Sequence, residues 1–322
     1  MKSLYEHRFN SVDAVQRECA SVKYIASRQI ATTVYLAFNL QKPILIEGPA
    51  GVGKTELAKA MSEILQVQLI RMQCYEGLDE SKALYEWKYG KQLLYTQLLK
   101  DKLSELMEGA KGLAQSIERL HSHDDLFFSE HFLEPRPLFK ALHEDTGCVL
   151  LIDEIDKSDQ EFEAFLLEVL SDFQVSIPEL GTISARVKPL VILTSNNTRE
   201  MSDALKRRCL HLYIPFPDAK LERQILETRV PGLSDTLRRE LVAFIQSVRT
   251  LDLKKQPSVS ETIDWARVLL LLSAEHLSVD LVRDTLNTFL KFEEDIAVAS
   301  EQIVGMLDKA REEAALAHAR NA

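Results

Sequence analysis

The chain has 322 residues, of which 46% are hydrophobic and 27% charged, as is typical of a globular protein with room for two domains. Its formal net charge of -10 argues against broad nucleic-acid binding, because phosphate contacts require a basic surface. The apolar runs are too short to span a membrane and the first ten residues lack an apolar signal region, so we expect a cytoplasmic protein without membrane insertion. The four cysteines have no CxxC spacing, and we expect buried reduced thiols rather than disulfides or zinc ligands.

Residues 11–40 are expected to form two helices, the first capped by Ser11 and the second by Ser27. Between them lies a short apolar stretch that includes Tyr24 and Ile25. In nucleotide-binding proteins, such a segment ahead of the phosphate-binding loop often walls the adenine. Plain core packing explains the same residues, so both interpretations stay open.

The stretch from Gly48 to Thr55, GPAGVGKT, fits the phosphate-loop pattern GxxxxGK[ST], and it lies between an apparent strand and an apparent helix as this motif requires. Glycines let backbone N–H groups turn toward a phosphate, and the helix N-terminus adds partial positive charge. We therefore expect ATP here, with Lys54 at the β and γ phosphates and the Thr55 hydroxyl on Mg²⁺. The predicted nucleotide-binding residues of this segment are Gly48, Pro49, Ala50, Gly51, Val52, Gly53, Lys54, Thr55 and Glu56.

A second strand is predicted over residues 67–73, and the next one follows only after a long interval, residues 74–147. This interval exceeds a simple crossover connection, and leucines at helical spacing between 98 and 120 predict an amphipathic helix within it. The aromatic cluster at 85–89 is either a partner contact or a buried anchor. The histidines and aspartates at 121–125 match no standard metal-ligand spacing, so we interpret them as a solvated loop.

Three further strands are predicted over residues 148–152, 189–194 and 210–214. Their alternation with helices indicates a parallel sheet with crossover helices. From about residue 218 the pattern is helical only. We therefore expect a nucleotide-binding α/β core over 1–217, with an insertion around 74–147, and a helical lid over 218–322 that ends in a polar, frayed tail.

Two adjacent carboxylates, Asp153 and Glu154, follow the apolar run at 148–152. At the carboxyl end of a strand in an open parallel sheet, such side chains project into the ligand crevice. Asp153 is placed to hold the hydration shell of Mg²⁺, and Glu154 to polarise the water that attacks the γ phosphate. The pair is typical of an ATP hydrolase rather than a small kinase. Asp156 is expected to cap the helix that begins near Ser158.

Past the strand at 189–194, Asn196 is placed to hydrogen-bond the γ phosphate or the attacking water, and we prefer it to Asn197. The segment at 203–209 ends in a run of cations, which a helix dipole alone would favour. An arginine supplied across a subunit boundary can accelerate phosphoryl transfer by about a thousandfold or more. We assign this role first to Arg208 and second to Arg207.

The segments GPAGVGKT, LLIDEID, TSNN and DALKRRC together resemble the motifs of AAA+ ATPases, in particular the MoxR family. The first two correspond to the Walker A and Walker B motifs. The similarity covers roughly residues 10–275. Further stretches are similar to the CoxD-type branch, which is associated with carbon monoxide dehydrogenase maturation, namely residues 161–173, 177–183, 257–259 and 262–267.

The resemblance implies a P-loop NTPase fold, a three-layer αβα sandwich with strand order 5-1-4-3-2 and a four-helix lid. It also implies a ring, usually a homo-hexamer, with ATP at the subunit boundaries. Insertions are expected within 74–147 and at the turn 178–181. Members of the family commonly act as chaperones in metallocofactor insertion, together with a von Willebrand A-domain protein and a client metalloenzyme.

Two positions bear on how the site is controlled. The family usually carries a cation at the start of a lid helix, where it touches the γ phosphate, but this chain has Ser260 there. Arg267, about two turns later, either substitutes for that cation or pairs with an acid. A polar residue on the second strand can also hold the hydrolytic glutamate away from the water, and Gln73 is the candidate.

We therefore predict an Mg-ATP-hydrolysing AAA+ chaperone of MoxR type. One alternative is a nucleic-acid motor or clamp loader built on the same core, which the net acidity disfavours. The other is a nucleotide-gated scaffold that assembles a partner with little hydrolysis.

Overall fold

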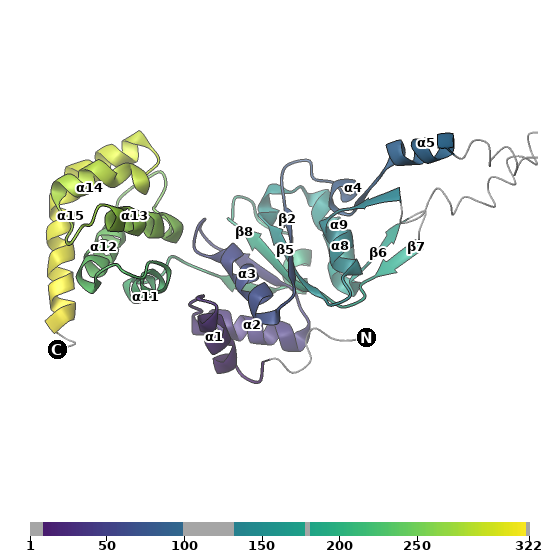
Figure 1. The fold of residues 1–322 in the computed structure, drawn as a ribbon, viewed down its shortest axis with the longest axis horizontal. Coiled ribbons are helices and arrows are strands. Elements are labelled where there is room, and N and C mark those ends of the chain that lie inside the picture. The colour runs from purple at the N-terminus through teal and green to yellow at the C-terminus, as the bar shows by residue number, and fades with distance from the viewer. Residues whose placement is uncertain (1–8, 99–131, 178–180, 320–322) are drawn as a thin grey trace, which may run out of the picture.

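The computed structural model describes residues 9–98, 132–177 and 181–319, which form an α/β core followed by a helical domain (Figure 1). The segment at 121–125 and most of the amphipathic helix expected between 98 and 120 lie outside the described residues. The same holds for most of the turn at 178–181.

The core is built on a five-stranded sheet in the order β2-β5-β8-β1-β9, with every neighbouring pair parallel. Counted along the chain, this is the predicted order 5-1-4-3-2, which is confirmed. The central strands β5 and β8 are buried along their whole length, as their continuous apolar runs require. The strands are β1 (Ile44–Glu47), β2 (Gln68–Gln73), β5 (Cys148–Asp153), β8 (Leu190–Ser195) and β9 (Leu210–Tyr213).

Helices cover both faces of the sheet, because alternate strand residues point to opposite sides. On one face, Ile44 and Val149 belong to a buried cluster with α1 (Val12–Ser21), α2 (Arg28–Leu40) and α3 (Lys54–Leu65). The predicted caps Ser11 and Ser27 are confirmed, since their side chains accept hydrogen bonds from the backbone N–H groups of Ala14 and Ile30.

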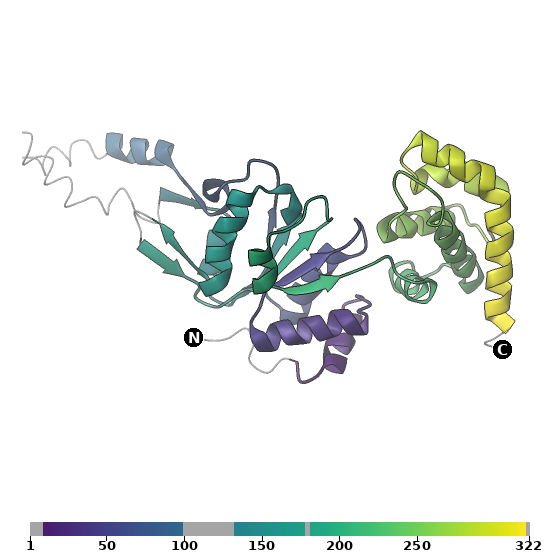
Figure 2. The same cartoon turned by 180° about the vertical axis from the view of Figure 1, so that it is seen from behind.

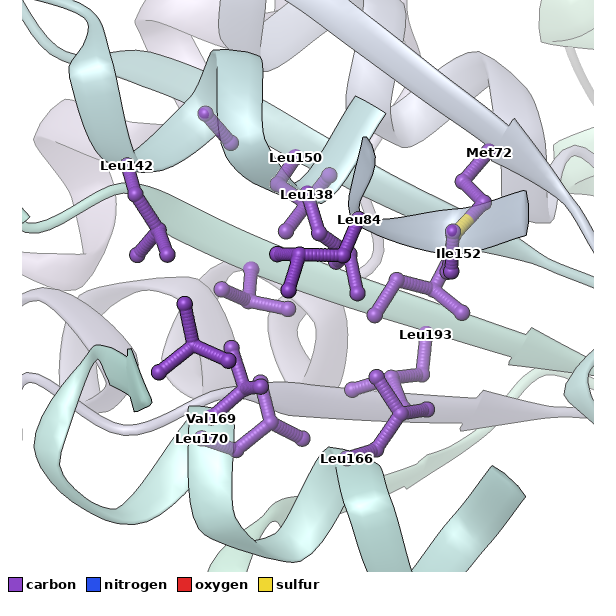
Figure 3. Packing of buried hydrophobic residues seen from close by; sticks show 14 of the residues in the cluster. Met72, Leu84, Leu138, Leu142, Leu150, Ile152, Leu166, Val169, Leu170 and Leu193 are labelled. Carbon is purple, nitrogen blue, oxygen red and sulfur yellow. The ribbon is translucent and has the colours of Figure 1, made fainter. Parts of the chain in front are cut away.

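The opposite face of the sheet carries a second cluster, in which Leu150, Ile152 and Leu193 of the strands meet side chains of two helices (Figure 3). These helices are α8 (Pro137–His143) and α9 (Gln160–Asp172). The two clusters and the sheet between them make the three layers of the predicted sandwich.

Between β2 and β5 the described part of the insertion contains α4 (Glu80–Ala83), β3 (Tyr85–Trp87), α5 (Tyr89–Leu98) and β4 (Leu133–Pro135). Strands β3 and β4 pair antiparallel, and Tyr85 and Trp87 pack against the second cluster. The aromatic residues at 85–89 therefore have two environments. Tyr85 and Trp87 anchor the insertion on the core, whereas Tyr89 is 68% exposed. Both views show α5 at the opposite end of the molecule from the helical domain (Figures 1 and 2).

Smaller elements complete the core. A 3-10 turn, η3 (Ile155–Lys157), follows β5, and an antiparallel hairpin of β6 (Gln174–Ile177) and β7 (Gly181–Ser184) follows α9. The short helix α10 (Asp203–Arg208) leads into β9.

All four cysteines, Cys19, Cys74, Cys148 and Cys209, are free and buried, and burial raises the pKa of each thiol to about 12. The prediction of buried thiols is confirmed.

The helical domain contains five α-helices among the described residues, rather than the four implied by the resemblance. They are α11 (Ala219–Arg229), α12 (Asp235–Val248), α13 (Val259–Leu271), α14 (Val279–Thr285) and α15 (Glu293–Ala319), with a 3-10 turn, η4 (Leu286–Thr288), after α14. Up to Ala319, the last described residue, the predicted frayed tail is wrong, because α15 is one helix of 27 residues. Its apolar face, which includes Ile303 and Leu307, is buried in the core of this domain.

None of the helices within the described ranges is long and apolar enough to cross a membrane.

Candidate functional site

Most of the predicted site residues gather at one edge of the sheet. Strand β1 runs into the loop at 48–53, which the first turn of α3 follows. Strand β5 ends at Asp153, and β8 ends just before Asn196. Since β1, β8 and β5 are neighbours and parallel, their carboxyl ends meet, and the loop, the carboxylates and the amide become adjacent.

The loop is held between the end of β9 and the lid, and two of its glycines are required by this packing. Gly48 has φ +145°, and a Cβ there would overlap the carbonyl oxygen of Ile214. Gly51 has φ +71°, and a Cβ would lie 2.5 Å from the Ser258 hydroxyl. At both positions a side chain would meet a steric clash as well as an unfavourable φ.

Lys54, the first residue of α3, is 7% exposed, and its ammonium is held by three neutral acceptors. Its Nζ donates to the carbonyl oxygens of Gly48 (2.6 Å) and Pro49 (2.7 Å) and to Asn196 Oδ1 (2.7 Å). Burial lowers the pKa of Lys54 to about 8, although the nearby carboxylates oppose this effect. A phosphate in the loop would supply the negative charge that these direct contacts lack.

Asp153 is buried beside the loop, with a side chain 5% exposed. Its Oδ1 accepts hydrogen bonds from Thr194 Oγ1 (2.5 Å) and Thr55 Oγ1 (3.2 Å). A hydroxyl and a carboxylate oxygen in contact are a donor set that suits Mg²⁺, which prefers oxygen ligands. Thr55 and Asp153 therefore fit the metal role predicted for them.

The other oxygen of Asp153 contacts a residue that the sequence did not reveal. Arg71, on β2, donates to Asp153 Oδ2 from Nη2 (2.6 Å) and Nε (3.1 Å). In the sequence, the only sign of this role is that Arg71 and Gln73 occupy alternate positions of the same strand. Their proximity to Asp153 and Glu154 can be recognised only once β2 is known to lie beside β5.

Three side chains hold the carboxylate of Glu154. Gln73 Nε2 donates to Oε2 at 2.8 Å, which is the contact predicted for that residue. Lys157, which the sequence did not single out, lies 2.5 Å from the same oxygen, and its pKa is raised by this hydrogen bond. Asn196 Nδ2 donates to Oε1 at 3.2 Å. Two of these contacts fall on Oε2 and one on Oε1, so the orientation of the carboxylate is set from both sides.

Asn196 bridges Lys54 and Glu154, so the structure brings it into the site as predicted. The side chain of Asn197 makes no such contact with described residues. Its backbone has φ 59°, and its N–H donates to Ser195 Oγ.

The cap predicted for Asp156 is wrong. Because η3 intervenes after β5, α9 begins later than expected, and its cap is Asp159, which accepts from the Phe162 N–H. Asp156 instead accepts from the N–H (3.1 Å) and the hydroxyl (2.6 Å) of Thr198. It thereby ties together the loops that follow β5 and β8.

Two adjoining cavities meet at the loop. The polar one, of about 250 Å³, is lined by Ala50, Lys54, Thr55, Asp153, Glu154 and Asn196, among others. The second, of about 300 Å³, has a largely apolar lining drawn from the core and the lid, including Tyr24, Ile25, Val52, Ile214, Leu221 and Ile263. Gly51, Gly53, Glu56 and Ser260 line both. This arrangement has room for phosphates in the first cavity and a base in the second.

Core packing of Tyr24 is confirmed, because this side chain belongs to the buried core. It also lines the apolar cavity, and its contact with adenine stays a prediction. Ile25 lines the cavity as well. Arg267 also lines the cavity, yet its Nη1 lies 3.2 Å from Asp264 Oδ1, and both side chains are largely exposed.

Two lid residues contact this region, one the loop itself and the other the first turn of α3. The Ser260 N–H donates to the carbonyl oxygen of Gly51 at 3.3 Å. Arg229, at the end of α11, lies 3.0 Å from Glu56, which is in the first turn of α3. Sequence reasoning missed Arg229, which gives the lid a cation beside the loop.

Arg207 and Arg208 are not brought into the site of their own chain. Leu210, two residues after Arg208, pairs with Ile44, at the end of β1 away from the loop. Both arginines are exposed, and Arg208 Nε donates to Ser171 Oγ at 2.7 Å. Both arginines therefore lie away from the loop of their own chain, and their assignment to a subunit boundary stays a prediction.

Comparison with known proteins identifies the family to which this chain belongs. Residues 43–209 match the family described as AAA domain (dynein-related subfamily). Uncharacterized proteins of Staphylococcus aureus strains USA300 and Mu50 are each 25% identical over 240 residues, which cover 72% of this chain and 77% of theirs.

Among solved structures, the Holliday junction branch migration motor RuvB of Thermotoga maritima is similar at 17% identity, with a TM-score of 0.42. The match covers 88% of this chain and 73% of that one. A mutant of the same protein matches at 18% identity with a TM-score of 0.45, covering 89% and 72%. The family match spans just over half of the sequence, and the chain belongs to the AAA domain family, dynein-related subfamily.

Proposed function

We propose that this chain is an Mg²⁺-dependent ATPase. The observation that carries the proposal is the grouping of Lys54, Asp153, Glu154 and Asn196 around one polar cavity, beside an apolar cavity of a size suited to a base. A buried ammonium with neutral acceptors favours an anionic ligand, and a carboxylate next to it favours hydrolysis once a water is placed.

Some residues of the site would bind Mg-ATP, and others would take part in its hydrolysis. Lys54 and the loop N–H groups would hold the phosphates, and Thr55 and Asp153 would hold Mg²⁺, which neutralises phosphate charge when bound. Glu154 would take a proton from the attacking water after its contacts with Gln73 and Lys157 are exchanged. Asn196 would orient the γ phosphate or that water.

Nucleotide binding is tested by Lys54→Ala. We expect its affinity for Mg-ATP to fall by about tenfold to a hundredfold, because charged hydrogen bonds to phosphate are lost. Titration with a fluorescent ATP analogue measures this change. The matched control is Lys140→Ala, an exposed lysine on α8, which should bind like the unaltered chain. Equal affinity of both variants would rule out the loop as the ATP site.

We further propose that ATP turnover drives a remodelling chaperone of the MoxR family, CoxD-type branch. Its support is the set of sequence motifs together with the two additions to the core, β3–β4 with α5 and the β6–β7 hairpin, at positions expected for that family. Such a protein would work in the cytoplasm as a homo-hexamer. Its partners would be a von Willebrand A-domain protein and a client metalloenzyme, of which carbon monoxide dehydrogenase is the type suggested by the resemblance.

Steady-state ATPase assays with and without a purified von Willebrand A-domain partner test this role. We expect turnover to rise several-fold when the partner engages, because the work of remodelling is coupled to hydrolysis. Duplex and single-stranded DNA serve as the comparison and should leave the rate unchanged. Stimulation by DNA alone would favour a nucleic-acid motor, and partner binding without faster turnover would favour a scaffold.

A further inference from the structure

Asp153 is already paired with a cation from its own chain. Both Arg71 contacts, from Nη2 and Nε, fall on Oδ2, while the two threonine hydroxyls occupy Oδ1. The carboxylate is nearly inaccessible, whereas the Arg71 side chain is 54% exposed. The charge of Asp153 is thus balanced by a guanidinium that has solvent beside it.

The position of Arg71 allows it to move. Strand β2 is an edge strand of the sheet, and Arg71 lines the polar cavity together with Lys54 and Glu154. Its Nη2 also donates to Gln73 Oε1 at 2.7 Å, on the next outward position of the same strand. Leaving Asp153 would cost Arg71 only interactions that water can replace, because an exposed guanidinium is readily solvated.

We propose that Arg71 is a positioning residue that acts as an internal counter-ion for Asp153 and gives this carboxylate up when Mg²⁺ binds. The inference rests on the proposed function, since it requires that Asp153 serve the metal. A guanidinium and a divalent cation on one carboxylate repel each other, and little solvent lies around Asp153 to screen them. Arg71 therefore weakens Mg²⁺ binding and sets how strongly nucleotide affinity depends on the metal.

The test compares Arg71→Met with its parent in a Glu154→Gln background, in which hydrolysis does not disturb the titration. The dissociation constant of a fluorescent ATP analogue is measured with EDTA and with saturating Mg²⁺. We expect the value in Mg²⁺ to fall by about twofold to tenfold, a range that corresponds to a partly exposed ion pair, and the value in EDTA to stay the same.

Two variants make the result specific. Gln68→Met changes an exposed residue at the start of the same strand, outside the lining of the polar cavity, so it should match the parent in both conditions. Arg71→Lys keeps a cation near Asp153 and should restore the parent's dependence on Mg²⁺. A cooperative thermal unfolding transition verifies that each variant is folded.

The other outcomes overturn the proposal. An unchanged or weaker affinity of Arg71→Met in Mg²⁺ would show that Arg71 does not compete with the metal. Weaker affinity in EDTA would show that it binds the phosphates instead. If the parent itself binds no nucleotide in either condition, the proposed function fails, which is distinguishable from failure of the Arg71 inference.

Discussion

Glu154→Gln should bind Mg-ATP but hydrolyse it at least about a hundredfold more slowly than the unaltered chain, because a carboxamide cannot accept a proton from the attacking water. Glutamine preserves the shape of the side chain, and Lys54 keeps its contacts with Gly48, Pro49 and Asn196. The variant should therefore trap ATP. Phosphate release gives the rate, and the nucleotide that stays with the protein after rapid filtration gives the trapped fraction.

Glu161→Gln is the matched control, because it makes the same change at an exposed position on α9 and should leave hydrolysis unaltered. Unchanged turnover in Glu154→Gln would remove Glu154 from the chemistry. Loss of both binding and turnover would instead point to a role in holding the nucleotide or the loop.

Much of the site could be predicted because its residues lie in short continuous segments. The phosphate loop is contiguous, and Asp153, Glu154 and Asn196 directly follow strands, so a parallel sheet brings them to one edge whatever the details of packing. Of the two asparagines after β8, it is Asn196 that contacts Lys54 and Glu154.

The missed residues depend on features that a single segment does not contain. Arg71 reaches Asp153 because β2 lies beside β5, which is a property of the strand order. Lys157 reaches Glu154 because the backbone of Glu154 turns at φ 57° into η3. The same 3-10 turn delays α9 and explains the error at Asp156.

The error at the C-terminus has a different cause. The buried positions of α15 recur at steps of three and four, but alanines and charged residues dilute the pattern, so the segment has the composition of a solvated tail. Its helical structure is stabilised by packing against α12, which the sequence of the segment alone does not display.

Arg208 is the last residue of α10, just before β9, at the end of the core away from the loop. Arg208→Ala should bind Mg-ATP with nearly unaltered affinity and lose hydrolysis by about a thousandfold, because an arginine donated across a subunit boundary acts mainly on the transition state. The register of β9 supports this separation, since Leu210 pairs with Ile44, at the end of β1 away from the loop. Truncating Arg208 therefore leaves its own nucleotide site intact.

Mixing two inactive variants tests whether the arginine acts between copies. Lys54→Ala copies retain Arg208 but lack a working loop, while Arg208→Ala copies retain the loop. In a mixed ring some intact loops lie beside an intact Arg208, so part of the ATPase activity should return although neither variant is active alone. Mixing Arg208→Ala with the double variant Lys54→Ala/Arg208→Ala is the control and should restore no activity.

If the mixture of Lys54→Ala and Arg208→Ala also stays inactive while both proteins assemble together, Arg208 does not act across the boundary. If Arg207→Ala alone abolishes hydrolysis, the neighbouring arginine has the role.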